Sequence, residues 1–148
     1  MATWGEIEDD VPDFAAKVLA RFKAGANTTL ATVRRDGGPR ISATEVTFQA
    51  GQVNFAMIPG SVKLQDIRLD PRVALHSPTT DAADSRPEEQ PGDAKLAGTL
   101  VQTKLLPDGV MFRMDITEAA FIRLEEGSQL VIESWDPHRK FLRRSRSI

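Results

Sequence analysis

Apolar residues recur at helical spacing near the start of the chain and at alternate positions over most of the remainder. Between residues 11 and 24 they lie three or four positions apart, after Asp10 and before Gly25. This spacing predicts a helix with one buried face, capped by Asp10 and ended by Gly25. Residues 1–10 are strongly acidic, and we expect them to form a loosely held N-terminal arm.

From residue 28 the pattern is typical of strands. Residues 28–34 and 40–49 flank Asp36-Gly37-Gly38, which suits a hairpin turn, and Ala50-Gly51 leads into a third strand over residues 53–57. Strands joined by such short turns pair in antiparallel fashion. The sequence therefore predicts a three-stranded antiparallel meander.

A second β-rich block follows, in which Val110, Phe112, Met114 and Ile116 alternate with polar residues. The further strands are expected over residues 72–77, 97–103, 110–117, 119–124 and 129–135. About six to eight short antiparallel strands with one or two helices close into a small barrel or pack as a sandwich. We therefore expect one mainly β domain of the α+β class, spanning residues 1–148.

Two segments have little apolar character. Residues 78–95 form an acidic, proline-rich stretch, which we interpret as a loop or lid beside a site or as an inert insertion. Residues 136–148 end the chain with basic residues and no acid after Pro137. This C-terminal tail is interpreted as solvated, or alternatively as lying across an anionic ligand or pairing with the acidic arm or the acidic loop of the same or another subunit.

The stretch between the two β blocks predicts a short helix. Ser61 is a good N-cap residue, Asp70-Pro71 ends the helix, and the intervening apolar residues Val62, Leu64, Ile67 and Leu69 are expected to form one side. Lys63 lies two residues after the cap. Free N–H groups at a helix start, a hydroxyl and an ammonium group suit a phosphate. The alternative interpretation is an ordinary capped connector helix.

Composition narrows the function classes. The chain has 148 residues, a formal net charge of −2, no cysteine and two histidines. The charge argues against a general nucleic-acid or membrane-surface binder, and the missing thiols exclude disulfides and cysteine-based metal sites. No apolar run approaches the roughly 20 residues that span a bilayer, and the acidic start lacks a signal-peptide core. We expect a cytoplasmic protein.

No group of residues suggests acid–base or nucleophilic catalysis. His76 lies in a predicted strand, and His138 has no evident proton to transfer. If the protein is an enzyme, a bound cofactor is expected to carry the chemistry. Positive groups then become the candidates for binding it: Ser61 with Lys63, and a second possible anion site where Arg34, Arg35 and Arg40 flank the first hairpin.

The chain resembles the pyridoxamine 5′-phosphate oxidase-like split β-barrels, which include FMN- and F420-dependent oxidoreductases. The resemblance covers about residues 13–76 and rests on the order and spacing of five segments: Thr29-Leu-Ala-Thr-Val-Arg34, Asp36-Gly-Gly-Pro39, Val53-Asn-Phe-Ala-Met57, Ser61-Val-Lys63 and Asp70-Pro-Arg-Val-Ala-Leu75. It implies a Greek-key, FMN-binding-like split β-barrel and a homodimer with cofactor at the subunit interface. The longer basic motif and C-terminal substrate segment of true pyridoxamine phosphate oxidases are missing.

The resemblance also implies roles for particular residues. Ser61 and Lys63 would hold the cofactor phosphate, and the strand end before them would run beside the ring. The full set of implied cofactor contacts is Arg40, Ser42, Thr44, Met57, Ile58, Pro59, Ser61, Lys63 and Trp135, with His138 and Arg139 beside Trp135 in the partner's C-terminal region. The implied activity is hydride transfer between F420 or FMN and a small unsaturated or conjugated substrate. The alternative is a binding or storage protein that holds flavin, F420 or haem without turnover.

Overall fold

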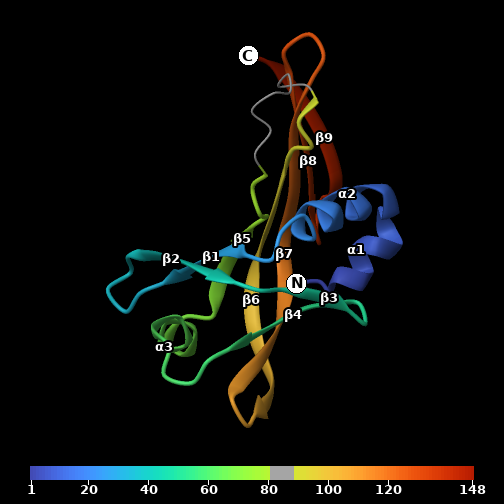
Figure 1. The fold of residues 1–148 in the computed structure, drawn as a ribbon. Coiled ribbons are helices and arrows are strands. Elements are labelled where there is room, and N and C mark those ends of the chain that lie inside the picture. The colour runs from blue at the N-terminus through green and yellow to red at the C-terminus, as the bar shows by residue number, and fades with distance from the viewer. Residues whose placement is uncertain (81–88) are drawn as a thin grey trace.

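The computed structural model describes residues 1–80 and 89–148, which form three helices and nine strands (Figure 1). The helices are α1 (Trp4–Asp10), α2 (Pro12–Phe22) and α3 (Val62–Leu69). The strands are β1 (Thr28–Val33), β2 (Pro39–Thr44), β3 (Thr47–Gln49), β4 (Gln52–Met57), β5 (Arg72–His76), β6 (Asp93–Leu106), β7 (Gly109–Glu125), β8 (Gln129–Asp136) and β9 (Lys140–Ser147).

All strand pairs are antiparallel, and the sheet runs in the order β2-β1-β5-β6-β7-β4-β3. β7 pairs along its length with β6, with β4 near its start, and with β8 near its end, and β8 in turn pairs with β9. The long strands β6 and β7 therefore run through the whole molecule, and β8 and β9 extend alongside the end of β7 (Figure 1). The predicted mainly β, α+β architecture is confirmed.

The predicted meander is wrong in one respect. The expected return strand over residues 40–49 is two short strands, and β2 pairs with β1 whereas β3 pairs with β4. These two strands occupy opposite ends of the sheet order, yet only Glu45 and Val46 separate them in the chain. Two residues span at most about 10 Å, so the sheet must curve strongly to bring its ends together.

The later strands are longer than predicted. The two strands expected over residues 110–124 are the single strand β7, with a register shift against β6 between Ala97 and Gly98. A side chain at Gly98 would put its Cβ 2.1 Å from the Asp115 carbonyl oxygen, so this close approach requires glycine. β6 begins at Asp93, which removes the last residues from the predicted loop over 78–95; positions 81–88 of that loop lie outside the described residues.

The prediction of a loosely held N-terminal arm is wrong. Thr3 and Glu6 form a reciprocal capping box that begins α1. Trp4 and Ile7 are buried in the core, and Ala2 pairs with Ile116 through two backbone hydrogen bonds of 2.7 and 2.8 Å. Acidic residues occupy the solvent side of this helix, and its few apolar residues fix it in place.

The predicted solvated tail is also ordered. Residues 140–147 form β9 on the outer edge of β8, although all its side chains are exposed. The ring of Phe141 contacts Phe14 of α2 at 5.6 Å between centroids, and Lys140 lies over the Trp135 ring. The strand has four basic residues and only two apolar ones, Phe141 and Leu142, so its cross-strand contacts with β8 decide the structure.

The core lies between the curved sheet and helices α1 and α2. The predicted inward row on β7 is confirmed, because Val110, Phe112, Met114 and Ile116 are all buried. Trp4 packs edge-on against Phe48, so α1 covers the β3–β4 hairpin. Within the described residues, no helix has the length and apolar character needed to cross a membrane.

Candidate functional site

Helix α3 begins as the sequence predicts. Ser61 is its N-cap, with the hydroxyl accepting a 3.3 Å hydrogen bond from the Leu64 N–H, and Asp70 ends it before Pro71. The backbone N–H groups of Val62 and Lys63 have no hydrogen-bond acceptor among the described residues. The start of α3 therefore offers unsatisfied donors at its positive end.

The apolar side predicted for α3 is only half correct. Leu64 and Ile67 are buried, but Val62 and Leu69 are 50% and 57% exposed. Residues 62 and 69 are seven apart and share a face, which is turned away from the face of residues 64 and 67. The two exposed residues contribute little to the core.

Lys63 points back to strand β2. Its Nζ donates a 2.8 Å hydrogen bond to the Ala43 carbonyl oxygen, and no carboxylate of the described residues forms an ion pair with it. A carbonyl oxygen orients an ammonium group but does not neutralise its charge. Two of the three ammonium protons remain available to a ligand.

A cleft of about 570 Å³ lies at the start of α3. Four of the predicted cofactor residues line it together, namely Thr44, Ile58, Ser61 and Lys63. Its apolar wall includes Ala56, Ile58 and Met111, and its polar wall includes Asn27, Thr47 and Asn54. An exposed acidic residue, Glu45, also lines the cleft. This cleft, which we call the α3-start cleft, combines the Lys63 cation, one carboxylate and an apolar surface.

The other predicted contacts from this part of the chain lie around the cleft but do not line it. Met57 is buried in the core at the end of β4, and Pro59 is exposed in the turn before Ser61. Ser42 lies two residues before Thr44 on the inward face of β2, and its buried hydroxyl has no hydrogen-bond partner. These three predicted contacts therefore lie outside the lining of the cleft.

Arg40 forms an ion pair with a residue of α3. Its Nε donates a 2.7 Å hydrogen bond to Oδ2 of Asp66, which also accepts a 2.8 Å bond from the Thr32 hydroxyl. Asp66 is buried, and the Arg40 guanidinium, followed by the Thr32 hydroxyl, lowers the pKa of its carboxyl against the opposing effect of burial. This triad anchors α3 to the β1–β2 hairpin and so positions Lys63.

Trp135 is placed in the core of its own chain. It is buried on β8, and its indole Nε1 donates a 2.8 Å hydrogen bond to Asp10, which consequently does not cap α2. The next residue, Asp136, accepts hydrogen bonds from the backbone N–H groups of His138 and Arg139, and from the Arg139 guanidinium. These bonds lower its carboxyl pKa to about 2. None of these residues lines the α3-start cleft.

Sequence reasoning missed the cleft residues that come from distant strands. Met111 reaches the site because it is the register partner of Ala56 in the β4–β7 pair. Asn27 precedes β1, and Asn54 lies on β4 opposite Thr47. The sequence shows the alternating pattern of each strand but does not show the order of the strands in the sheet. These residues are brought together by that order alone.

The residues present fit a cofactor with a phosphate and a planar ring. The ammonium of Lys63, the Ser61 hydroxyl and the free N–H groups of α3 are phosphate donors, and the apolar wall suits an aromatic ring. Among the described residues, no group of three or more histidine, aspartate or glutamate side chains is arranged to hold a metal ion.

No protein-family profile and no curated protein sequence matches the chain. Solved structures do resemble it. PhzG from Burkholderia lata 383, in complex with tetrahydrophenazine-1-carboxylic acid, aligns over 93% of this chain and 89% of its own, with a TM-score of 0.68 and 11% identity. A haem-binding protein from Mycobacterium smegmatis aligns over 82% of this chain and 57% of its own, with a TM-score of 0.62 and 16% identity.

An F420 reductase aligns over 66% of this chain and 91% of its own, with a TM-score of 0.52 and 18% identity. At these identities the likeness concerns the fold alone. The chain has the split-barrel fold of these proteins, as predicted. What each neighbour binds is a property of that neighbour.

Proposed function

We propose that the α3-start cleft binds FMN or F420 and that the protein is an oxidoreductase acting on a small unsaturated or conjugated substrate. One observation carries the proposal: Lys63 is an unneutralised cation beside free helix-start N–H groups, at the end of a cleft with an apolar wall. The fold agrees with it, since an F420 reductase is among the structural neighbours.

In this proposal the chain binds and orients, and the cofactor supplies the hydride chemistry when it is bound. Lys63 and Ser61 hold the phosphate, with the N–H of Val62 as a further donor. Ala56, Ile58 and Met111 contact the ring, and Ile58 is 72% exposed and so able to bury apolar area on binding. The Arg40–Asp66–Thr32 triad keeps α3 and its donors in position.

We also propose that two copies form a homodimer through the outer face of the sheet. Ile41, Ala31, Ala74 and Ala97 are successive register partners on β2, β1, β5 and β6, and they line a shallow hollow of about 240 Å³. Ile41 is 75% exposed there. A partner's sheet would cover this apolar face, and its C-terminal region would complete the cofactor site.

Sedimentation of the wild type and Ile41→Glu tests the dimer. The wild type is expected to be a dimer and the variant a monomer with unchanged circular dichroism, because a carboxylate cannot be buried unpaired in the interface. A wild type that stays monomeric at high concentration contradicts the dimer.

A second candidate is a binding protein for a planar ligand without turnover. The titratable residues that line the cleft, Glu45 and Lys63, form no ion pair with any described residue, and a haem-binding protein is among the structural neighbours. Neither histidine lines the cleft, which favours a flavin or deazaflavin over haem as its ligand.

Titration with FMN, F420 and haem side by side, followed by turnover assays with the ligand that binds, separates the candidates. The oxidoreductase predicts saturable binding of FMN or F420 and oxidation of the reduced cofactor by conjugated acceptors. Tight binding without turnover over a broad acceptor panel favours the binding protein. Failure of all three ligands to bind contradicts both.

A further inference from the structure

A second cleft lies on the other side of α3, between that helix and the β1–β2 hairpin. Its volume is about 740 Å³, and four arginines line it, namely Arg34 and Arg35 at the hairpin turn, Arg40 on β2, and Arg68 on α3. Ser61 and Lys63 belong to the α3-start cleft and do not line this one. We call it the arginine cleft.

The positive charge of the arginine cleft exceeds its negative charge. Its carboxylates are Asp36 and Asp66, which leaves four guanidinium groups against two carboxylates. Asp66 is buried and binds Arg40 and Thr32, and Asp36 accepts a 2.8 Å hydrogen bond from the Gly38 N–H at the turn. The excess stands out in a chain whose formal net charge is −2.

Three of the arginines keep exposed guanidinium groups. Arg34, Arg35 and Arg68 are exposed, and no hydrogen bond or ion pair joins their side chains to another described residue. They come from two elements that the Arg40–Asp66 ion pair holds together. A partly buried contact therefore fixes the two backbone segments that carry them, in contrast to arginines scattered over a surface.

The same cleft contains exposed apolar area. Val62 and Leu69, the two α3 residues that the core does not use, line it beside Gln65. Residues 62, 65 and 69 lie on one face of the helix. The cleft therefore offers an apolar strip on α3 with guanidinium groups beside and opposite it.

We infer that the arginine cleft binds a small molecule with at least two carboxylate or phosphate groups and a short apolar segment. Guanidinium groups bind such anions through paired, charge-assisted hydrogen bonds, and three of them from two elements suit a polyanion better than a monoanion. The apolar segment would cover Val62 and Leu69. This site is independent of the proposed cofactor role of Lys63.

Isothermal titration calorimetry with citrate and pyrophosphate, at constant ionic strength and with acetate for comparison, tests the inference. The wild type is expected to bind at least one polyanion saturably and acetate far more weakly. The double variant Arg35→Gln/Arg68→Gln should lose about tenfold or more in affinity, since it removes charge-assisted hydrogen bonds. The matched control Arg144→Gln/Arg146→Gln, which removes the same charge from β9, should change affinity by less than about twofold.

The variant Lys63→Ala distinguishes binding in the arginine cleft from binding in the α3-start cleft. It should leave the affinity for the polyanion unchanged. Equal losses in the two double variants, displacement of the polyanion by FMN or F420, or no saturable binding of either polyanion would overturn the inference. If the arginine variant is destabilised, NMR amide chemical shifts of the wild type provide the test. Addition of a polyanion should change the amide shifts of residues 34–36 and 65–69 and leave those of residues 140–147 unchanged. Shifts confined to other residues also overturn it.

Discussion

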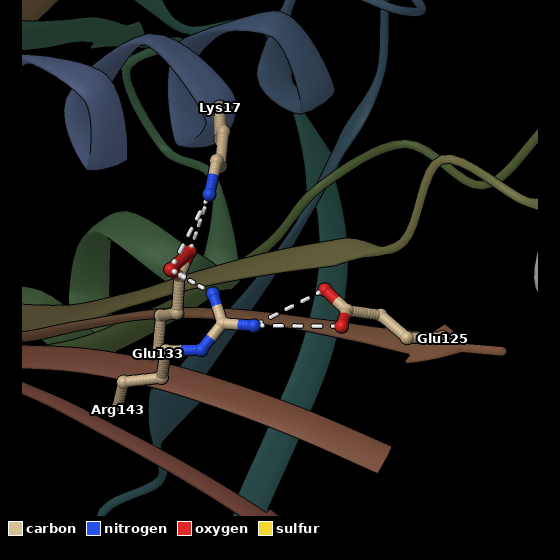
Figure 2. A network of polar contacts seen from close by, with 4 residues as sticks. All are labelled: Lys17, Glu125, Glu133 and Arg143. Atoms are coloured by element: carbon tan, nitrogen blue, oxygen red, sulfur yellow. Dashed lines mark hydrogen bonds and ion pairs between the residues drawn. The ribbon is translucent and has the colours of Figure 1, made fainter. Parts of the chain in front are cut away.

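Two regions of the molecule place charged side chains close to the core. They differ in whether those side chains have partners of opposite charge. At the start of α3, the one hydrogen bond that the Lys63 side chain forms with the described residues is to a backbone carbonyl, and the backbone N–H groups of Val62 and Lys63 have no acceptor among those residues. On β8, Glu133 is 5% exposed and has two cationic partners (Figure 2).

The Glu133 network links three elements. Lys17 of α2 donates to Glu133 at 2.9 Å, and Arg143 of β9 contacts Glu133 at 3.5 Å and Glu125 of β7 at 3.3 Å. Figure 2 shows Arg143 between the two carboxylates, with Lys17 reaching down from the helix. Two cations and two carboxylates balance, so this network holds α2 and β9 against the sheet and has no charge left for a ligand.

The contrast distinguishes structural charge from binding charge. Balanced, mutually satisfied groups contribute to stability, whereas oriented but unsatisfied groups cost stability and are available to a ligand. Substitutions in the Glu133 network should therefore change the free energy of unfolding and leave cofactor affinity alone. Substitution of Lys63 at the α3 start should do the reverse.

The largest effect on stability is expected from Glu133→Ala. Removing the buried carboxylate leaves Lys17 and Arg143 without their shared partner; because both cations retain contact with solvent, we expect a loss of about 2–3 kcal/mol in urea unfolding. The matched control Glu125→Ala removes a more exposed carboxylate and should cost less than about 0.5 kcal/mol. Equal costs for the two variants would show that burial of Glu133 is unimportant.

Asp66→Asn should lower the free energy of unfolding by about 2 kcal/mol, somewhat less than Glu133→Ala. Asparagine keeps the shape of the side chain but loses the charge that Arg40 binds. The folded-state pKa of Asp66 lies below its ordinary value of 3.8, so its stabilisation is complete above that value and is lost as the pH falls through the folded pKa. Unfolding measured from pH 6 to pH 2 should show a steeper loss in the wild type than in Asp66→Asn. Parallel curves would contradict this role.

A smaller effect is expected at the helix start. Ser61→Ala removes the cap of α3 and should cost about 1 kcal/mol, whereas Ser61→Asn, which also caps helices, should cost little. Both variants change the proposed contact with the phosphate and should weaken the binding of FMN or F420. Calorimetric binding and thermal unfolding of both separate capping from ligand contact: if Ser61→Asn binds like the wild type, the hydroxyl is only a cap.

Local signals in the sequence predicted the start and the end of α3 well. Ser61, Lys63 and Asp70-Pro71 lie within one short segment, and the rules of helix capping apply to such a segment without tertiary information. The Arg40–Asp66 pair joins positions 26 residues apart and depends on how α3 packs on the hairpin. Nothing in the pattern distinguished Asp66 from a solvated helical carboxylate.

The structures of the two chain ends were mispredicted because their many charged residues suggested solvated segments, although a few residues at each end pack against the rest of the molecule. Thr3 and Glu6 have the spacing of a capping box, and Trp4 and Ile7 have helical spacing, but the acidic residues around them favoured a solvated arm. At the other end, the pairing of β9 with β8 needs the position of β8, which local reasoning does not supply. Edge strands rich in basic residues resemble disordered tails in sequence.

The sharpest test of the Lys63 contact compares ligands with and without a phosphate; FMN and riboflavin differ by the phosphate alone, whereas F420 and its chromophore differ by the phosphate and the chain that it carries. FMN and riboflavin, and F420 and its phosphate-free chromophore, are titrated into the wild type, Lys63→Ala and the control Lys104→Ala, whose lysine is exposed on β6. A phosphate contact at Lys63 should strengthen binding of one phosphate-bearing ligand to the wild type and Lys104→Ala by about tenfold or more, and Lys63→Ala should lose most of this advantage with unchanged stability. Equal affinity of the wild type for both members of each pair would contradict it.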